Sequence, residues 1–304
     1  MTKNSTMQLL LFLLLGMALG ATLFFSPHVS LAVQQGLTLC YRTVFPSLFP
    51  FFVLSTLLIS LGFADFLARA LNRPMQLLFH LNGGCAGALI LGLLGGYPVG
   101  ARTALTLYRQ GDCTREEAER LLAFCNNCGP AFILSVAGST ALQSRKAGVL
   151  LYLIHVLAAL CTGLIFRGEN IPSKAPCLRK TTRPDFAPAF VASVQSAFSS
   201  MLSVCGFVVF FAVLLHPLKT VTKSGLLLGT VELFNGICSL EPTPAGFVSA
   251  AALIGWGGLS VHAQTVAILC DENLSLGSYF KGKAVQAFLS VIFALFTVLF
   301  LPWQ

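Results

Sequence analysis

The sequence predicts an all-α, polytopic transmembrane protein. Of its 304 residues, 56% are hydrophobic and only 10% are charged, and its mean hydropathy is +0.81. A water-soluble domain of this composition would leave too much apolar surface in contact with water. The chain also holds several apolar runs long enough to cross a bilayer. We therefore expect a multi-pass protein of the cell membrane, with the lipid bilayer as a partner.

The excess of positive charge fits the same class. The chain has 19 Lys and Arg against 11 Asp and Glu, a formal charge of +8. These basic residues are scattered between the apolar runs, as in loops held at the cytoplasmic face. A nucleic-acid-binding protein would gather them in one patch, so we expect no nucleic acid partner.

The first half of the chain begins with an apolar run at residues 8–25, which we interpret as an uncleaved transmembrane helix. A cleavable signal peptide is the alternative, because Lys3 precedes the run and small residues such as Ala18 and Ala21 lie near its end. A second span is predicted at residues 46–63, and a third at 146–166.

Two helix breaks are predicted between these spans. Three glycines and a proline within six residues should unwind the backbone at Gly95, Gly96, Pro98 and Gly100. Thr114 and Glu117 then form a capping box that starts a helix. That helix stops where Asn126 and Asn127 precede Gly129 and Pro130. Unpaired backbone groups are tolerated in a membrane only against protein or a water-filled cavity.

The second half repeats this order after a polar, basic linker at residues 167–185. It contains a span near 200–216, a glycine-containing segment from 226, a break at Gly257 and Gly258, and a last span ending near 301. We therefore divide the chain into an N-terminal helix and connection (1–44), a first repeat (45–166), the linker, and a second repeat (186–304). An odd number of crossings in each half makes the repeats inverted, with the amino terminus and linker in the cytoplasm.

Paired, interrupted segments in two halves indicate a binding site near the membrane midplane. Exposed amino ends of half-helices suit an anionic or strongly polar ligand. Glu232 is the most informative candidate, because a carboxylate among apolar neighbours is expensive in lipid and could carry a coupling proton. The structural alternative is a pair with Arg102 or His262 that holds the halves together. The candidate binding residues are Tyr97, Arg102, Asn126, Asn127, Glu232, Asn235, Ser260, His262 and Gln264.

Other chemistries find less support in the residues. Cys125 and Cys128 have no second pair of soft ligands at a matching interval, so we predict no metal and no cofactor. His155 is interpreted as a hydrogen-bonded packing residue. Ser260 and His262 lie two positions apart, on different faces of a helix, which disfavours an intramembrane hydrolase. We expect no enzymatic activity, and the absence of a GxxxxGK[ST] loop excludes a P-loop ATPase or GTPase.

Three stretches carry a family resemblance. They are the motif LGGYPVGA at 94–101, the helix EAERLL at 117–122 leading into FCNNCGPAFI at 124–133, and GWGGLSVHAQ at 255–264. From about residue 45 to its end, the chain resembles the sporulation integral membrane protein YlbJ family, built from the nucleoside-recognition Gate domain. Similar Gate domains occur in nucleoside transporters and ferrous iron permeases.

The resemblance implies a transporter or permease for a small polar or anionic solute. For spore-forming members, the implied cargo is dipicolinate, a small aromatic dianion. A nucleoside or metal-ion permease and a non-transporting scaffold needed for sporulation remain alternatives.

Overall fold

The computed structural model describes residues 3–168, 185–270, 272 and 274–300. These residues are helical and contain no β-strand, which confirms the predicted all-α class. Five helices are long and apolar enough to cross a membrane, or six if a bent pair counts as one span. They are Ser26–Ser60, Arg145–Ile165, Phe186–Val221, Pro244–Leu269 and Gly277–Phe300. Most of the predicted linker at 167–185 lies outside the described residues.

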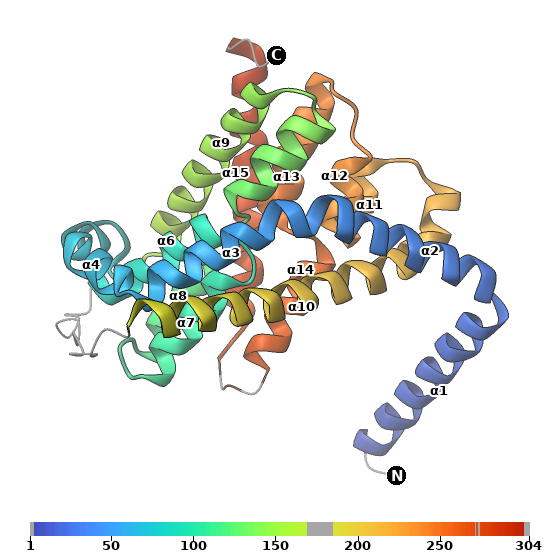
Figure 1. The fold of residues 1–304 in the computed structure, drawn as a ribbon, viewed down its shortest axis with the longest axis horizontal. Helices are drawn as coiled ribbons and strands as arrows, with labels where there is room; N and C mark the ends of the chain where they lie inside the picture. Colours follow the sequence, from blue (N-terminus) through green and yellow to red (C-terminus); the bar gives the residue numbers. More distant parts are fainter. Residues whose placement is uncertain (1–2, 169–184, 271, 273, 301–304) are drawn as a thin grey trace.

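The amino-terminal part of the chain is more helical than expected. Helix α1 (Lys3–Phe24) projects from the rest of the molecule (Figure 1), and its apolar part is shorter than the five spans. Helices α2 (Ser26–Leu39), η1 (Cys40–Val44) and α3 (Phe45–Ser60) then follow one another as one span. The connection expected before residue 45 is therefore part of this helix, and the span predicted to begin at 46 starts twenty residues earlier. Gln34, Gln35 and Arg42 concealed it by lowering the local hydropathy.

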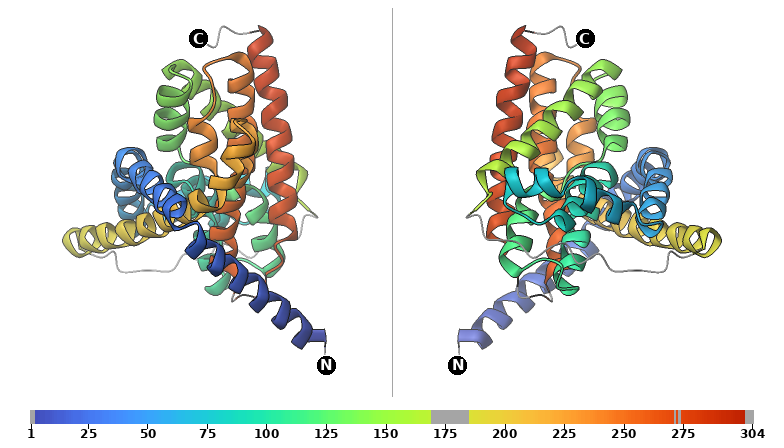
Figure 2. Two further views of the ribbon diagram at one scale, coloured as in Figure 1. Left: turned by 90° about the vertical axis from the view of Figure 1, so that its right-hand side faces the viewer. Right: turned by 90° about the vertical axis from the view of Figure 1, so that its left-hand side faces the viewer.

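Two long helices run across the front of the molecule. Helix α10 (Phe186–Val221) packs along both α2 and α3, as Figure 1 shows. Behind this pair stand α9 (Arg145–Ile165), α13 (Pro244–Trp256) and α15 (Gly277–Phe300), which pack against one another. In Figure 2, α9 and α15 run in opposite directions. Inverted repeats require this arrangement of the last span of each half, although the repeat itself stays a prediction.

Four interruptions of the backbone separate consecutive helices. The first separates α6 (Ala86–Gly95) from α7 (Val99–Arg109), and the second separates α8 (Arg115–Cys125) from η4 (Phe132–Ala141). In the second half, α11 (Gly225–Val231) gives way to α12 (Leu233–Cys238) at Glu232, and α13 gives way to α14 (Gly258–Leu269) at Gly257. The breaks predicted at the three clusters of glycine and proline are confirmed, because these residues end or bend a helix by local backbone chemistry.

Helix α8 starts as its sequence predicts. The Thr114 hydroxyl accepts a hydrogen bond from the Glu117 amide at 3.2 Å, and the Glu117 carboxylate accepts one from the Thr114 amide at 2.8 Å. This reciprocal cap fixes the amino end of α8. The helix ends eleven residues later, at the second break.

The short helices α4 (Phe63–Ala70), α5 (Asn72–Pro74), η2 (Met75–Phe79) and η3 (Gly83–Cys85) form one end of the molecule. The chain bends there by 98° between Asn72–Phe79 and Gly83–Gly95. One apolar core lies between α3, η4, α9, α10 and α13, and a second lies around α6, α7 and α8. The first two breaks lie where these cores adjoin.

Candidate functional site

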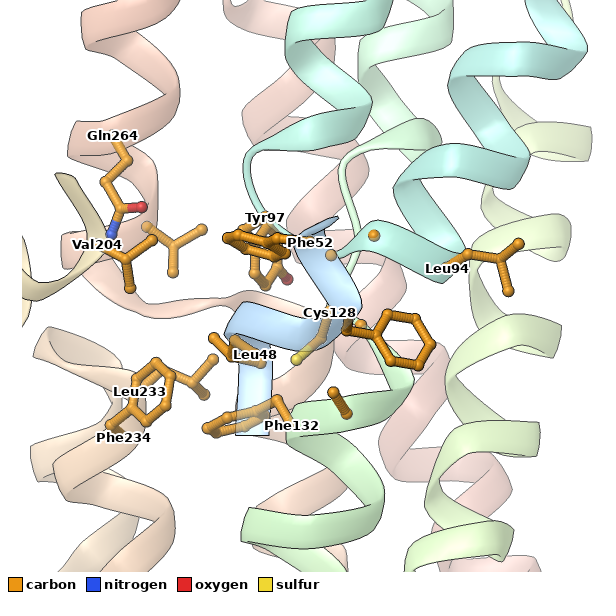
Figure 3. Close-up of a pocket in the computed structure, with 16 residues that line it drawn as sticks. Leu48, Phe52, Leu94, Tyr97, Cys128, Phe132, Val204, Leu233, Phe234 and Gln264 are labelled. Atoms are coloured by element: carbon orange, nitrogen blue, oxygen red, sulfur yellow. The ribbon is translucent and has the colours of Figure 1, made fainter. Parts of the chain in front are cut away.

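A cavity lies where the interrupted helices meet (Figure 3). About 40 Å³ of its interior is open to a water-sized molecule, and its wall is largely apolar. Tyr97 and Gln264 are its polar side chains among those labelled in Figure 3. Residues from both halves of the chain contribute, namely Leu48, Phe51, Phe52, Leu94, Gly95, Gly96, Tyr97, Cys128, Gly129, Ala131, Phe132, Val204, Leu233, Phe234, Val261 and Gln264.

The breaks approach one another closely enough to touch through their backbones. A methyl group on Gly96 would lie 2.9 Å from the Gly129 nitrogen, and Gly96 has a φ of 77° that favours glycine. A methyl group on Gly100 would lie 2.0 Å from the Cys125 carbonyl oxygen. Glycine is therefore required at both positions to let the first break pack against the second.

Tyr97 joins the first break to the fourth. Its hydroxyl donates a hydrogen bond to the Ile254 carbonyl at 3.2 Å, near the end of α13. Gly257, at the fourth break, lies beside the same hydroxyl. Tyr97 thus lines the cavity and connects the two halves of the chain.

A fully buried polar cluster lies behind Tyr97, between the second break and α15. Lys283 donates to the Asn126 carbonyl at 3.1 Å and to Gln286 Oε1 at 2.7 Å. Gln286 Nε2 donates to Asn127 Oδ1 at 2.8 Å and lies 3.5 Å from His155 Nδ1. The Lys283, Gln286, Asn126 and Asn127 side chains have no exposed surface. The cluster satisfies backbone groups that the helix break frees.

His155 performs the packing role predicted from its position. Its Nε2 accepts a hydrogen bond from the Cys128 amide at 3.1 Å, and the residue is 1% exposed. Because Cys128 lines the cavity, this bond ties α9 to the cavity wall. Cys125 and Cys128 are free thiols, and among the described residues no group of three His, Cys, Asp or Glu side chains could hold a metal ion.

His262 extends the cluster along α14. Its Nδ1 lies 2.8 Å from the Tyr279 hydroxyl, which donates to Thr265 Oγ1 at 3.3 Å. Asn126 Nδ2 donates to the same Thr265 oxygen at 2.9 Å. The buried atoms His262 Nε2 and Asn126 Oδ1 have no hydrogen-bond partner. A continuous series of polar contacts therefore runs from His262 to Asn126.

Glu232 has different partners from those expected. Its carboxylate accepts hydrogen bonds from the Phe234 and Asn235 amides at 3.1 and 2.7 Å, so it caps helix α12. It also accepts from Asn235 Nδ2 at 2.8 Å, and Asn235 Oδ1 accepts from Lys219 Nζ at 2.9 Å. The predicted alternative of a structural pair with Arg102 or His262 is wrong, because nearer donors at the α12 terminus satisfy the carboxylate.

The structure separates the predicted site residues into four groups. Tyr97 and Gln264 line the cavity, while Asn126, Asn127 and His262 belong to the polar cluster behind it. Ser260 is buried on α14. Arg102, Glu232 and Asn235 lie outside the cavity lining, and Arg102 is exposed and donates to Ser200 Oγ at 3.3 Å on α10. The assignment of these residues to solute binding stays a prediction.

Sequence reasoning missed Lys283 and Gln286, together with Tyr279 and Thr265. A signal for the first two was present, because a lysine and a glutamine interrupt the apolar run of the last span. Ionisable residues inside a membrane span mark functional sites by default, and the same rule had selected Glu232. Tyr279 and Thr265 carried no comparable signal.

Comparisons with known proteins agree with this architecture. Residues 41–143 match the Gate family model, described as nucleoside recognition. The chain is also 28% identical to the sporulation integral membrane protein YlbJ of Bacillus subtilis (strain 168) over 335 aligned positions, which cover 94% of this chain and 82% of that protein. No solved structure matches. The protein is therefore a multi-pass integral membrane protein that resembles YlbJ along nearly its whole length and matches the Gate family model in its first half.

Proposed function

We propose that this protein carries a small polar or anionic solute across the membrane, through the cavity where its helix breaks meet. The convergence of these breaks from both halves of the chain is the observation that carries the proposal. Discontinuous helices meeting at one point in a bundle are the usual form of a secondary transporter site. Free backbone groups there can bind a solute, and the two halves can move about it.

The proposed cargo is dipicolinate, in a sporulation role like that named for YlbJ. Two features support an anion. The break between α8 and η4 places the amino end of η4 at the cavity wall, through Gly129, Ala131 and Phe132. A helix amino end carries a partial positive charge, which favours an anionic ligand. A buried lysine lies behind the same wall.

A nucleoside is the second candidate cargo, because the Gate segment matches a model described as nucleoside recognition. We propose transport rather than catalysis, since His262 Nδ1 is engaged with Tyr279, on another helix, instead of with Ser260. A scaffold without transport activity would not need a cavity between the two halves of the chain.

Uptake into proteoliposomes tests the proposal. Radiolabelled dipicolinate and a nucleoside would be compared, with and without a proton gradient. Val261→Phe fills part of the cavity, whereas the matched control Leu259→Phe lies on the same helix with 49% of its surface exposed. We expect saturable dipicolinate flux in the wild type and the control, and a loss of about tenfold or more in Val261→Phe, equivalent to about 1.4 kcal/mol.

Two other outcomes would change the assignment. Saturable nucleoside flux without dipicolinate flux would replace the cargo and keep the transport function. No flux of either compound, in protein shown to be folded by its thermal melting curve, would contradict the proposal and favour the scaffold role.

A further inference from the structure

The buried ammonium group of Lys283 has fewer hydrogen-bond acceptors than it has N–H donors. An ammonium group has three N–H donors. Two of them reach oxygen atoms, on the Asn126 carbonyl and the Gln286 side chain. Lys283 Nζ also lies over the Tyr97 ring, 5.3 Å from its centroid. The side chain is 0% exposed, so water in the bulk does not complete its hydrogen bonding.

No carboxylate compensates this cation within the described part of the chain. The ion pairs recorded there, Arg109–Glu272 and Arg115–Glu119, both lie elsewhere. Neutral carbonyl groups and an aromatic ring stabilise an ammonium only in part. A buried charge without a counter-charge costs several kcal/mol. An anionic group would supply the missing counter-charge.

Tyr97 lies between this cation and the solute cavity. The side chain that contacts Lys283 also lines the cavity, in the position labelled in Figure 3. One neutral hydrogen bond, from its hydroxyl to the Ile254 carbonyl, holds it there. Such a bond contributes about 1 kcal/mol net. Because its ring separates the two, Lys283 can reach the cavity only if this side chain moves.

We propose that Lys283 binds the carboxylate group of the transported solute, and that Tyr97 separates the two in this closed conformation. This inference rests on the proposed transport function and adds to it the residue that binds the carboxylate of the solute. A carboxylate oxygen matches the one donor direction that lacks an oxygen acceptor. A phosphate would need more donors than the cluster leaves, because Asn126 Nδ2 and Gln286 Nε2 are already engaged.

Equilibrium binding to the purified full chain in detergent tests the inference separately from transport. The probes are dipicolinate and pyridine-2,6-dicarboxamide, its neutral diamide of the same shape. The variants are Lys283→Gln, which keeps a donor but removes the charge, and Lys283→Arg, which keeps the charge. Lys281→Gln is the matched control, because Lys281 is exposed on the same helix.

We expect Lys283→Gln to weaken dipicolinate binding by about 10- to 100-fold, as for loss of a hydrogen bond to a charged group. Its affinity for the diamide should change less than about threefold, and Lys283→Arg should recover part of the dipicolinate affinity. Lys281→Gln should bind as the wild type does. Retained diamide binding shows that Lys283→Gln is folded.

Three results would overturn the inference. They are unchanged dipicolinate affinity in Lys283→Gln, equal losses for the two probes, and no dipicolinate binding by the wild type. Unchanged affinity combined with loss of proton-driven uptake would assign Lys283 to the coupling proton instead. Dipicolinate binding that depends on Lys283, without flux in proteoliposomes, would contradict the transport function and leave the binding site in place.

Discussion

Lys283 and Glu232 are both fully buried charged residues, but the structure treats them differently. The hydrogen bonds to the Glu232 carboxylate come from residues within three positions of it in the chain, and they form a helix cap. Lys283 instead contacts Asn126 and Tyr97, far away in sequence. Its hydrogen-bond acceptors are neutral, and its Nζ lies over an aromatic ring.

The difference teaches that burial alone does not mark a functional charge. A buried carboxylate that receives three hydrogen bonds at a helix amino end is stabilised where it is, and it explains the break between α11 and α12. A buried ammonium without a carboxylate is destabilising unless something else compensates it. We therefore weigh Lys283 as the functional charge and Glu232 as a structural one.

The largest expected effect comes from separating Lys283 from its partners without changing its charge. A methyl group on Gly282 would lie 2.2 Å from the Ala123 carbonyl oxygen, so Gly282→Val forces α15 away from α8. We expect a loss of stability of about 3 kcal/mol or more, because backbone atoms cannot move aside. Chemical denaturation in detergent micelles measures it. The control Ala284→Val, at an exposed position on α15, should unfold near the wild-type midpoint. Equal midpoints for both variants would contradict this packing.

The next effect tests the structural role of Glu232. Glu232→Ala removes the cap of α12 and leaves the Phe234 and Asn235 amides unsatisfied, so stability should fall by about 2 kcal/mol. Thermal melting checks this, with Glu241→Ala as a control at an exposed glutamate. A Glu232→Ala protein with wild-type stability but no uptake would reverse the comparison, making this carboxylate the functional charge.

A smaller effect is expected where the Lys283 cluster extends to His262. Tyr279→Phe removes the hydroxyl that donates to Thr265 and lies 2.8 Å from His262 Nδ1. The loss should be about 1 kcal/mol, visible as a lower melting temperature. Tyr41→Phe, on an 80% exposed side chain, should melt as the wild type does. A loss of dipicolinate binding as large as that expected for Lys283→Gln would show that the cluster acts as a unit.

The smallest effect is expected at an exposed ion pair. Arg109 Nη2 lies 2.7 Å from Glu272 Oε1, and the two side chains are 56% and 21% exposed. Because water and salt screen such a pair, Arg109→Ala should change stability by less than about 1 kcal/mol. Melting in low and high salt measures the difference, and Arg115→Ala, in the other exposed pair, should behave alike. A loss above about 2 kcal/mol would show that this pair holds a conformation closed.

Composition and local backbone chemistry were sufficient to predict the membrane class, the span placed at 146–166, the capped start of α8 and the breaks at the glycine and proline clusters. These features depend on neighbours in the chain: apolar length decides a span, and glycine, proline or a capping side chain decides where a helix ends. The helical segment at 26–44 was missed because the polar side chains of Gln34, Gln35 and Arg42 lower its mean hydropathy.

The meeting of the breaks and the identity of the charge beside them depend on packing between distant elements. Lys283 lies 157 positions from Asn126, and Tyr97 lies the same distance from Ile254. No local pattern states which helix faces will touch, so the cost of burying a charge pointed to Glu232, and Lys283 was missed. The folded chain distinguishes them physically, because Glu232 finds donors on its own helix, whereas Lys283 needs a partner that the described chain does not supply.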